Sequence, residues 1–267
     1  MFGSRNKPVD KSVLPYLNLG CGRHFHAAWT NVDLAASAPG VLQHDLLKPL
    51  PFPKASFAVV YHSHVLEHLP RGKAPEFLAE CHRVLQAGGT LRAVVPDLET
   101  IARLYLESLT RAAAGDAVAR DRHEWMTIEL LDQLTRDRSG GEMLRYWRRD
   151  PMPAGDFVLE RLGAEARDSV AKMRGRNAPT EPEPTPQQAA KFRASGEIHR
   201  WMYDRLSLRL LLEQCGFDEV TVCTAHESRI PDFARFALDT ESDGAVRKPD
   251  SLFVEARKPA VLGSPPP

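Results

Sequence analysis

The first residues whose types and spacing could do chemistry stand near the N-terminus. Gly20-Cys21-Gly22 follows the apolar run of residues 14–19. Glycine has no Cβ, so the backbone of such a turn can approach a ligand closely. The pattern predicts a turn that binds the charged end of a small ligand.

Two acidic residues lie near the ends of the next two apolar segments. Asp33 lies at the end of residues 29–34, and Asp45 lies at the end of residues 41–46. An acid at a strand end can accept hydrogen bonds from both hydroxyls of a ribose, and the second acid can meet the amino group of an adenine. A helix-capping or turn role is the alternative for either aspartate. The predicted contacts of a ribose-containing cofactor are Asn18, Gly20, Cys21, Gly22, Asp33, Leu34, Asp45, Leu46 and His62.

Several groups in the chain could move a proton. His62 and His64 follow the apolar run of residues 57–61, Asp97 follows residues 90–95, and His199 lies further along the chain. A neutral imidazole is a natural base near pH 7. We therefore predict these four residues as catalytic candidates. The alternative for the histidines is a capping, cofactor-lining or anchoring role.

Histidine spacing also permits a metal hydrolase. His62, His64 and His68, with Glu67 between them, are close enough in sequence to converge on zinc. The four cysteines contain no C-x-x-C pair, so neither a thiolate zinc site nor a redox motif is indicated. No metal site is predicted, and hydrolysis stays open as a lesser alternative.

Apolar runs separated by turn signals predict the elements that position these residues. The predicted strands are residues 14–19, 29–34, 41–46, 57–61, 90–95, 219–224 and 251–256. Amphipathic helices are predicted over residues 74–85, with Ala87-Gly88-Gly89 as a glycine C-cap, and over residues 203–214. Strands that alternate with helices favour a parallel sheet, which binds ligands at the carboxyl ends of its strands.

The predicted organisation has four parts. Residues 1–98 form the cofactor-binding half of a core, residues 198–258 complete that core, and residues 259–267 form a disordered tail. Residues 99–197 are a helical insertion with a proline-rich linker at 177–186. This insertion is either a packing element or a cap over the substrate, and the sequence leaves both open.

Composition narrows the class of protein. Lys and Arg number 35, as do Asp and Glu, so the formal net charge is zero and nothing favours general nucleic-acid binding. No apolar stretch is typical of a signal peptide or of a membrane-spanning helix. We expect a reduced, cytoplasmic protein.

Residues 16–22 together with residues 31–34 resemble the first two motifs of class I S-adenosylmethionine (SAM) dependent methyltransferases. Residues 64–69, His-Val-Leu-Glu-His-Leu, and residues 80–89, which end in Ala-Gly-Gly, are similar to elements of the methyltransferase type 11 group. This chain has Ala87 where the group usually has proline, Asn18 where many members have an acid, and Arg23-His24 in place of a third glycine.

The resemblance implies a Rossmann-like, seven-stranded, mostly parallel α/β sheet with a helical insertion, and SAM as the cofactor. Residues 199–204, 215–217 and 249–256 resemble a narrower set of bacterial predicted methyltransferases associated with cell-surface polysaccharide synthesis. That set implies a small-molecule, sugar or lipid-linked glycan acceptor, methylated on oxygen. The resemblance to the methyltransferase type 11 group implies a structural role for Glu67 and His68. A non-catalytic SAM-fold binding protein is the main alternative.

Overall fold

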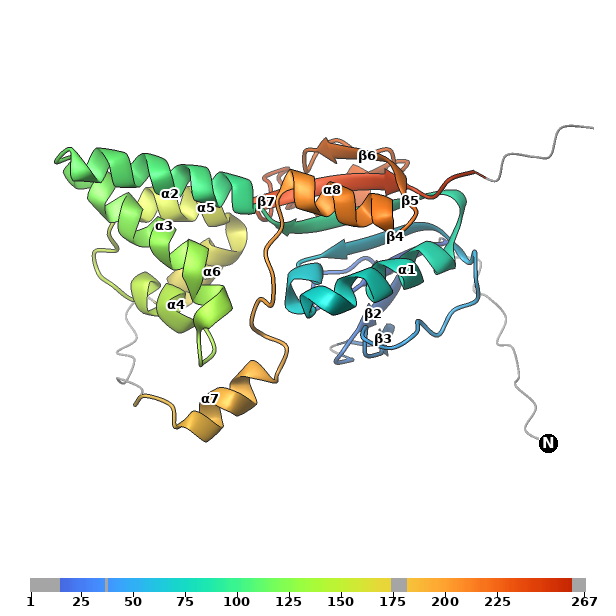
Figure 1. Cartoon of the computed structure of the whole chain (residues 1–267), viewed down its shortest axis with the longest axis horizontal. Coiled ribbons are helices and arrows are strands. Elements are labelled where there is room, and N and C mark those ends of the chain that lie inside the picture. Colours follow the sequence, from blue (N-terminus) through green and yellow to red (C-terminus); the bar gives the residue numbers. More distant parts are fainter. Residues whose placement is uncertain (1–14, 37, 174–181, 261–267) are drawn as a thin grey trace, which may run out of the picture.

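The computed structural model describes residues 15–36, 38–173 and 182–260 of the 267-residue chain (Figure 1). Residues 177–181 of the predicted linker and residues 261–267 of the predicted tail lie outside the described residues. None of the described helices is both long enough and apolar enough to cross a bilayer.

Seven strands form one sheet in the order β3-β2-β1-β4-β5-β7-β6. They are β1 (Tyr16–Leu19), β2 (Thr30–Asp33), β3 (Val41–Gln43), β4 (Phe57–Ser63), β5 (Leu85–Pro96), β6 (Asp218–Cys223) and β7 (Ser251–Arg257). Strands β1 to β5 pair in parallel, whereas β7 runs antiparallel to both of its neighbours. This is the class I methyltransferase fold, as predicted.

The two faces of the sheet are covered differently. Helices α1 (Ala74–Val84) and α8 (Arg205–Gln214) lie on one face, where Phe77, Leu208 and Leu212 join the strand residues in the main core (Figure 1). The other face is covered by the segment of residues 224–249, which contains the short 3-10 helix η3 (Phe233–Phe236). Its aromatic rings pack on Trp29 and Tyr61.

The predicted glycine C-cap after residues 74–85 is wrong. Helix α1 ends at Val84, and Leu85 already begins β5 in register with Phe57. Gly89 lies inside β5, where a Cβ atom would stand 3.0 Å from the carbonyl oxygen of Ala58. The helix ends because Leu85 enters the sheet, and the glycine permits close approach between two strands.

The connections in the N-terminal half also differ from the expected alternation of strands and helices. Residues 20–29 link β1 to β2 through turns alone, and residues 44–56 link β3 to β4 without a helix. Two short 3-10 helices, η1 (Leu66–His68) and η2 (Arg71–Lys73), precede α1. The edge that carries the predicted cofactor residues is therefore built from loops.

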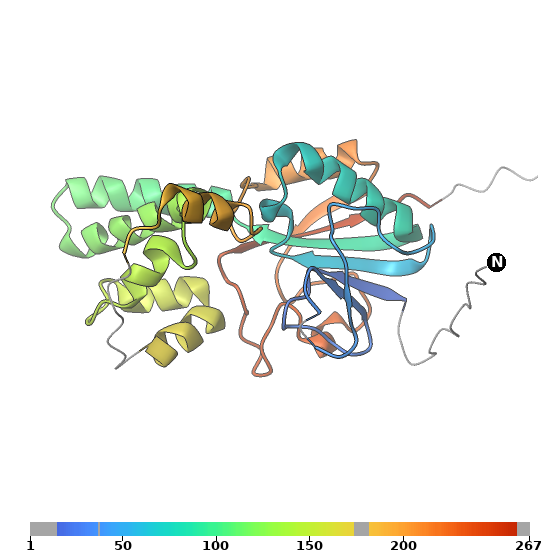
Figure 2. The same cartoon turned by 90° about the horizontal axis from the view of Figure 1, so that it is seen from below.

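A helical insertion extends from the end of β5, at the carboxyl edge of the parallel strands (Figures 1 and 2). It contains α2 (Leu98–Ala113), α3 (Ala117–Thr135), α4 (Gly141–Trp147), α5 (Gly155–Leu162) and α6 (Ala164–Met173), and α7 (Pro186–Arg193) follows. The insertion has its own core around Trp125, Met126 and Tyr146. A buried ion pair joins α3 to α5, with Arg161 Nη2 lying 2.6 Å from Glu129 Oε1.

Candidate functional site

The turn after β1 has two glycines with different surroundings. Gly20 has a φ of +67°, and a Cβ atom there would lie 2.2 Å from Cγ2 of Val65. Gly22 has a φ of +55°, and a Cβ atom there would meet nothing within 4 Å among the described residues. Gly20 therefore packs directly against Val65, whereas Gly22 lines a cavity and leaves space for a ligand on its Cα side.

Asp33 is tied to this turn. The backbone N–H of Gly22 donates a hydrogen bond of 2.8 Å to Asp33 Oδ2, and the N–H of Ala35 donates one of 3.1 Å to Oδ1. A carboxylate oxygen can accept two hydrogen bonds, so each oxygen of Asp33 keeps capacity for a ribose hydroxyl. Asn18 is buried, and its Nδ2 donates to Asn31 Oδ1.

The remaining cofactor candidates follow the neighbouring strands. Asp45 lies just after β3, where its Oδ1 accepts a hydrogen bond from the N–H of Leu47. Leu46 packs against the main core, and the Leu34 side chain is 59% exposed. The strand order places the ends of β1, β2 and β3 side by side, so the predicted residues share one edge of the sheet.

A cavity of about 620 Å³ opens beside the glycine turn. The core, the helical insertion and the segment of residues 224–249, here called the late loop, all contribute to its lining. The lining residues are Asn18, Gly20, Cys21, Gly22, Arg23, His24, Tyr61, Ser63, His64, Ala164, Asp168, Ser169, Lys172, Leu238, Glu241, Arg247 and Lys248. Asp33, Leu34, Asp45, Leu46 and His62 are not part of this lining. Asp33 reaches the cavity only through its hydrogen bond to Gly22.

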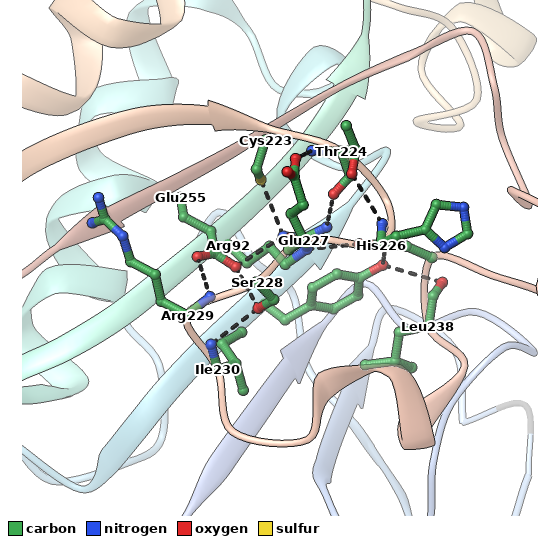
Figure 3. Close-up of polar contacts among 12 residues, drawn as sticks. Arg92, Cys223, Thr224, His226, Glu227, Ser228, Arg229, Ile230, Leu238 and Glu255 are labelled. Atoms are coloured by element: carbon green, nitrogen blue, oxygen red, sulfur yellow. Dashed lines mark hydrogen bonds and ion pairs between the residues drawn. The ribbon is translucent and has the colours of Figure 1, made fainter.

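Arg92 fixes the late-loop wall of this cavity. It is fully buried in β5, with Nε 2.7 Å from Asp239 Oδ2 and Nη1 2.8 Å from Glu255 Oε1. Its Nη1 and Nη2 also donate to the carbonyl oxygens of Glu227 and Thr224 (Figure 3). The Tyr61 hydroxyl donates to the other oxygen of Asp239. The sequence reasoning missed this network, although an arginine inside the apolar run of residues 90–95 was a detectable signal.

His62 does not reach the cavity. Successive side chains of a strand point to opposite faces, so Tyr61 and Ser63 line the cavity while His62 packs on Phe77 of α1, with ring centroids 5.3 Å apart. Its side chain is fully buried, and neither ring nitrogen has a hydrogen-bond partner among the described residues. Burial lowers the pKa of His62 to about 4. This position does not fit the predicted roles of His62 as a base or as a cofactor contact.

His64 lies where two cavities meet. Besides the first cavity, it lines a second one of about 460 Å³, whose other lining residues include Arg136, Met143, Trp147 and Asp250. Its Nε2 lies 2.8 Å from Ser251 Oγ, and its Nδ1 lies 3.2 Å from Glu67 Oε1. A carboxylate beside Nδ1 favours the tautomer that keeps a lone pair on Nε2.

The other two catalytic candidates lie outside both of these cavities. Asp97 is the N-cap of α2, and its Oδ1 accepts a hydrogen bond from the N–H of Thr100. His199 is buried beside His68, with ring centroids 4.9 Å apart. Burial is the main cause that lowers the pKa of His199 to about 3. The structure therefore brings His64 and the glycine turn together, but not Asp97, His62 or His199.

One family model matches part of the chain. Residues 17–93, less than a third of the chain, match the family model described as "Methyltransferase domain" (Methyltransf_11). No curated protein matches the sequence significantly.

Similar solved structures include a SAM dependent methyltransferase from Archaeoglobus fulgidus, which is 13% identical, with 93% of this chain and 87% of that chain covered and a TM-score of 0.41. A methyltransferase from Bacillus halodurans is 14% identical, with 94% of each chain covered and a TM-score of 0.39. A complex of the Haloferax volcanii Trm112 methyltransferase activator with a methyltransferase contains a chain that is 14% identical, with 95% and 86% covered and a TM-score of 0.39. TM-scores below 0.5 do not support a closer relationship. Two features of the chain itself indicate a methyltransferase: residues 17–93 match a methyltransferase family model, and the sheet around them has the class I methyltransferase strand order.

Proposed function

We propose that this chain is a SAM-dependent methyltransferase that binds its cofactor in the cavity beside Gly20 and Gly22. The residues that line this cavity and its glycine turn fit SAM. The open space at Gly22 admits a ligand against the backbone, and Asp33 holds the turn while keeping acceptor capacity for a ribose. The cavity volume of about 620 Å³ falls within the usual range for small-molecule sites.

The second cavity is the proposed acceptor site. Its lining combines apolar side chains, such as Met143 and Trp147, with charged and polar ones, such as Arg136 and Asp250. An aromatic ring beside polar groups suits a sugar, which presents both apolar ring faces and hydroxyls. We therefore favour an oxygen acceptor on a glycan, a nucleotide sugar or a lipid-linked precursor. A role in cell-surface polysaccharide synthesis rests only on the resemblance of the C-terminal segments.

His64 is the proposed base. When bound, SAM supplies an electrophilic methyl group on a sulfonium. His64 Nε2 would accept the proton of the acceptor hydroxyl, while the new C–O bond forms and the electron pair of the broken C–S bond stays on sulfur. Glu67 Oε1, 3.2 Å from Nδ1, would hold the ring in the required tautomer. The observation that carries the proposal is that His64 lines both cavities.

Calorimetric titration with S-adenosylhomocysteine tests the cofactor site. We expect micromolar binding by the wild type, and about 10- to 100-fold weaker binding by Asp33→Ala, because a charged acceptor of two hydrogen bonds is lost. Asp33→Asn keeps one acceptor oxygen and should fall between them. Asp218→Ala, at an exposed position of β6, is the control. Absence of binding by the wild type would overturn the proposal.

Labelled SAM with a panel of glycan and nucleotide-sugar acceptors tests the chemistry. His64→Gln should retain cofactor binding and lose turnover. Cofactor binding by the wild type without transfer to any acceptor in the panel would favour the non-catalytic alternative over an enzyme.

A further inference from the structure

The side chains of Glu67, His68 and His199 converge near His64, and none of the three is part of the lining of either cavity. Glu67 and His68 belong to η1, and His199 comes from a segment about 130 residues further along the chain. One ligand atom from each of the three residues lies within 4.8 Å of the others. Glu67 is fully buried and His199 is 4% exposed. The fold therefore assembles a carboxylate and two imidazoles from distant parts of the sequence.

Several buried polar atoms of this cluster have no hydrogen-bond partner among the described residues. Among the described residues, Glu67 Oε2 has no hydrogen-bond partner, and the contact of Oε1 is an ion-pair contact with Nδ1 of His64, at 3.2 Å. Nδ1 of His199 is also buried and has no partner within the described part of the chain. Buried polar atoms nearly always have a partner, because leaving them without one costs free energy. These atoms indicate that something outside the polypeptide satisfies them.

His68 is oriented as metal-binding histidines are. Its Nδ1 lies 3.1 Å from the carbonyl oxygen of Ile198. A carbonyl can only accept, so Nδ1 carries the proton and the lone pair of Nε2 is left for a ligand. A second hydrogen bond of this kind fixes the tautomer and the ring orientation of histidines that bind metals.

Nearby cations do not block the cluster. Arg136 has an electrostatic influence on His199, but its Nη2 lies 3.5 Å from Glu197 Oε1 and also donates to the Glu197 carbonyl. Arg71 stacks on the Trp201 ring, with its guanidinium carbon 4.2 Å from the ring centroid. Both guanidinium groups therefore have partners of their own.

We propose that Glu67, His68 and His199 bind a divalent transition-metal ion, with zinc as the best representative. Two imidazoles and one carboxylate form a donor set that suits zinc and its neighbours in the first transition row. This site is independent of SAM binding and goes beyond the proposed function.

The ion would have a positioning role. The N–H groups of Arg200 and His199 already donate to the carbonyl oxygens of Glu67 and of Gln133 in α3. A metal on His199 and Glu67 would lock this crossing, where the core, the insertion and the C-terminal segment meet. Because Glu67 Oε1 also contacts His64, the ion would fix the orientation of the proposed base.

Metal content of tag-free, chelator-stripped protein tests the site. We expect wild-type protein to take up one Zn²⁺ per chain in a calorimetric titration without SAM, and to give visible absorption when loaded with Co²⁺. Glu67→Gln and His199→Gln should each weaken Zn²⁺ binding at least 10-fold, and the double variant should abolish uptake. His226→Gln, at an exposed position, is the matched control and should bind like the wild type.

Wild-type protein that binds no Zn²⁺ or Co²⁺ would overturn the proposal, whether or not the variants fold. Unchanged uptake in folded Glu67→Gln and His199→Gln would overturn it too, because the ion would then lie elsewhere. Titration with S-adenosylhomocysteine on the same preparations reports separately on the cofactor site, so that failure of one proposal is distinguishable from failure of the other.

Discussion

At the scale of single residues, the sequence selected His62 and His64 together as candidates and did not distinguish between them. His62 and His64 are equivalent in a reading of motifs, since both follow the same apolar run. The structure separates them, because His62 packs on α1 while His64 lines two cavities. Alternation along a strand would place both on one face, but β4 ends at Ser63 and His64 has a φ of +53°, so the chain changes direction between them. The apolar run of residues 57–61 did not predict where the strand would end.

The two glycines of the turn should respond differently to alanine. Both have a positive φ, which costs an alanine about 1–2 kcal/mol. Gly20→Ala adds a clash with Val65, so we expect about 1–3 kcal/mol of further destabilisation. Urea unfolding of Gly20→Ala, Gly22→Ala and the double variant Gly20→Ala/Val65→Ala measures the backbone cost and the steric cost separately. Equal losses for the two single variants would contradict the steric role of Val65.

His62 should make stability depend on pH. Its pKa is about 4 in the folded protein, against 6.5 for an exposed histidine, so the unfolded chain binds more protons between these two pH values. The stability contributed by neutral His62 is therefore present above pH 6.5 and is lost as the pH falls towards 4. We expect the drop in unfolding free energy from pH 7.5 to pH 5 to be about 2 kcal/mol smaller in His62→Leu than in the wild type. His226→Leu, at an exposed position, is the control, and parallel curves for His62→Leu and the wild type would contradict the argument.

At the scale of elements, apolar runs predicted all seven strands, since buried strands need them. Element ends were less predictable. Leu85 could end a helix or begin a strand, and pairing with Phe57 decides for the strand. The segment of residues 224–249 carries no helical or strand periodicity, so its covering of one sheet face was not predicted. Its position depends on long-range contacts with Arg92.

Replacing Arg92 should therefore lower the free energy of unfolding strongly. Arg92→Met leaves the buried carboxylates of Asp239 and Glu255 without their cation, and breaking such a buried ion pair costs about 3–5 kcal/mol. Arg209→Met is the matched control, because its pair with Glu213 is exposed and worth less than about 1 kcal/mol. Chemical unfolding gives both values. A similar small loss in the two variants would show that the late-loop wall does not depend on Arg92.

At the scale of the whole molecule, the first cavity belongs to no single part of the chain. The glycine turn belongs to the core, α6 belongs to the insertion, and residues 238–248 belong to the late loop. A helical insertion was predictable from its amphipathic composition, but its roles as a packing element and as a cap were not separable in sequence. In the structure the insertion has its own core and also contributes to the linings of the two cavities, so a role as a cap stays a prediction.

Cofactor binding should therefore protect three distant segments together. A ligand that contacts all three walls stabilises the folded protein, and this gain in free energy grows with the ratio of ligand concentration to Kd. We expect saturating S-adenosylhomocysteine to slow backbone hydrogen exchange in residues 17–22, in α6 (Ala164–Met173) and in residues 238–248, and to leave α7 (Pro186–Arg193) unchanged. Mass spectrometry of peptides from the free and the saturated protein measures this directly. Protection confined to residues 17–46 would mean that the cofactor lies on the sheet edge alone, and that the insertion closes the acceptor cavity without contacting the cofactor.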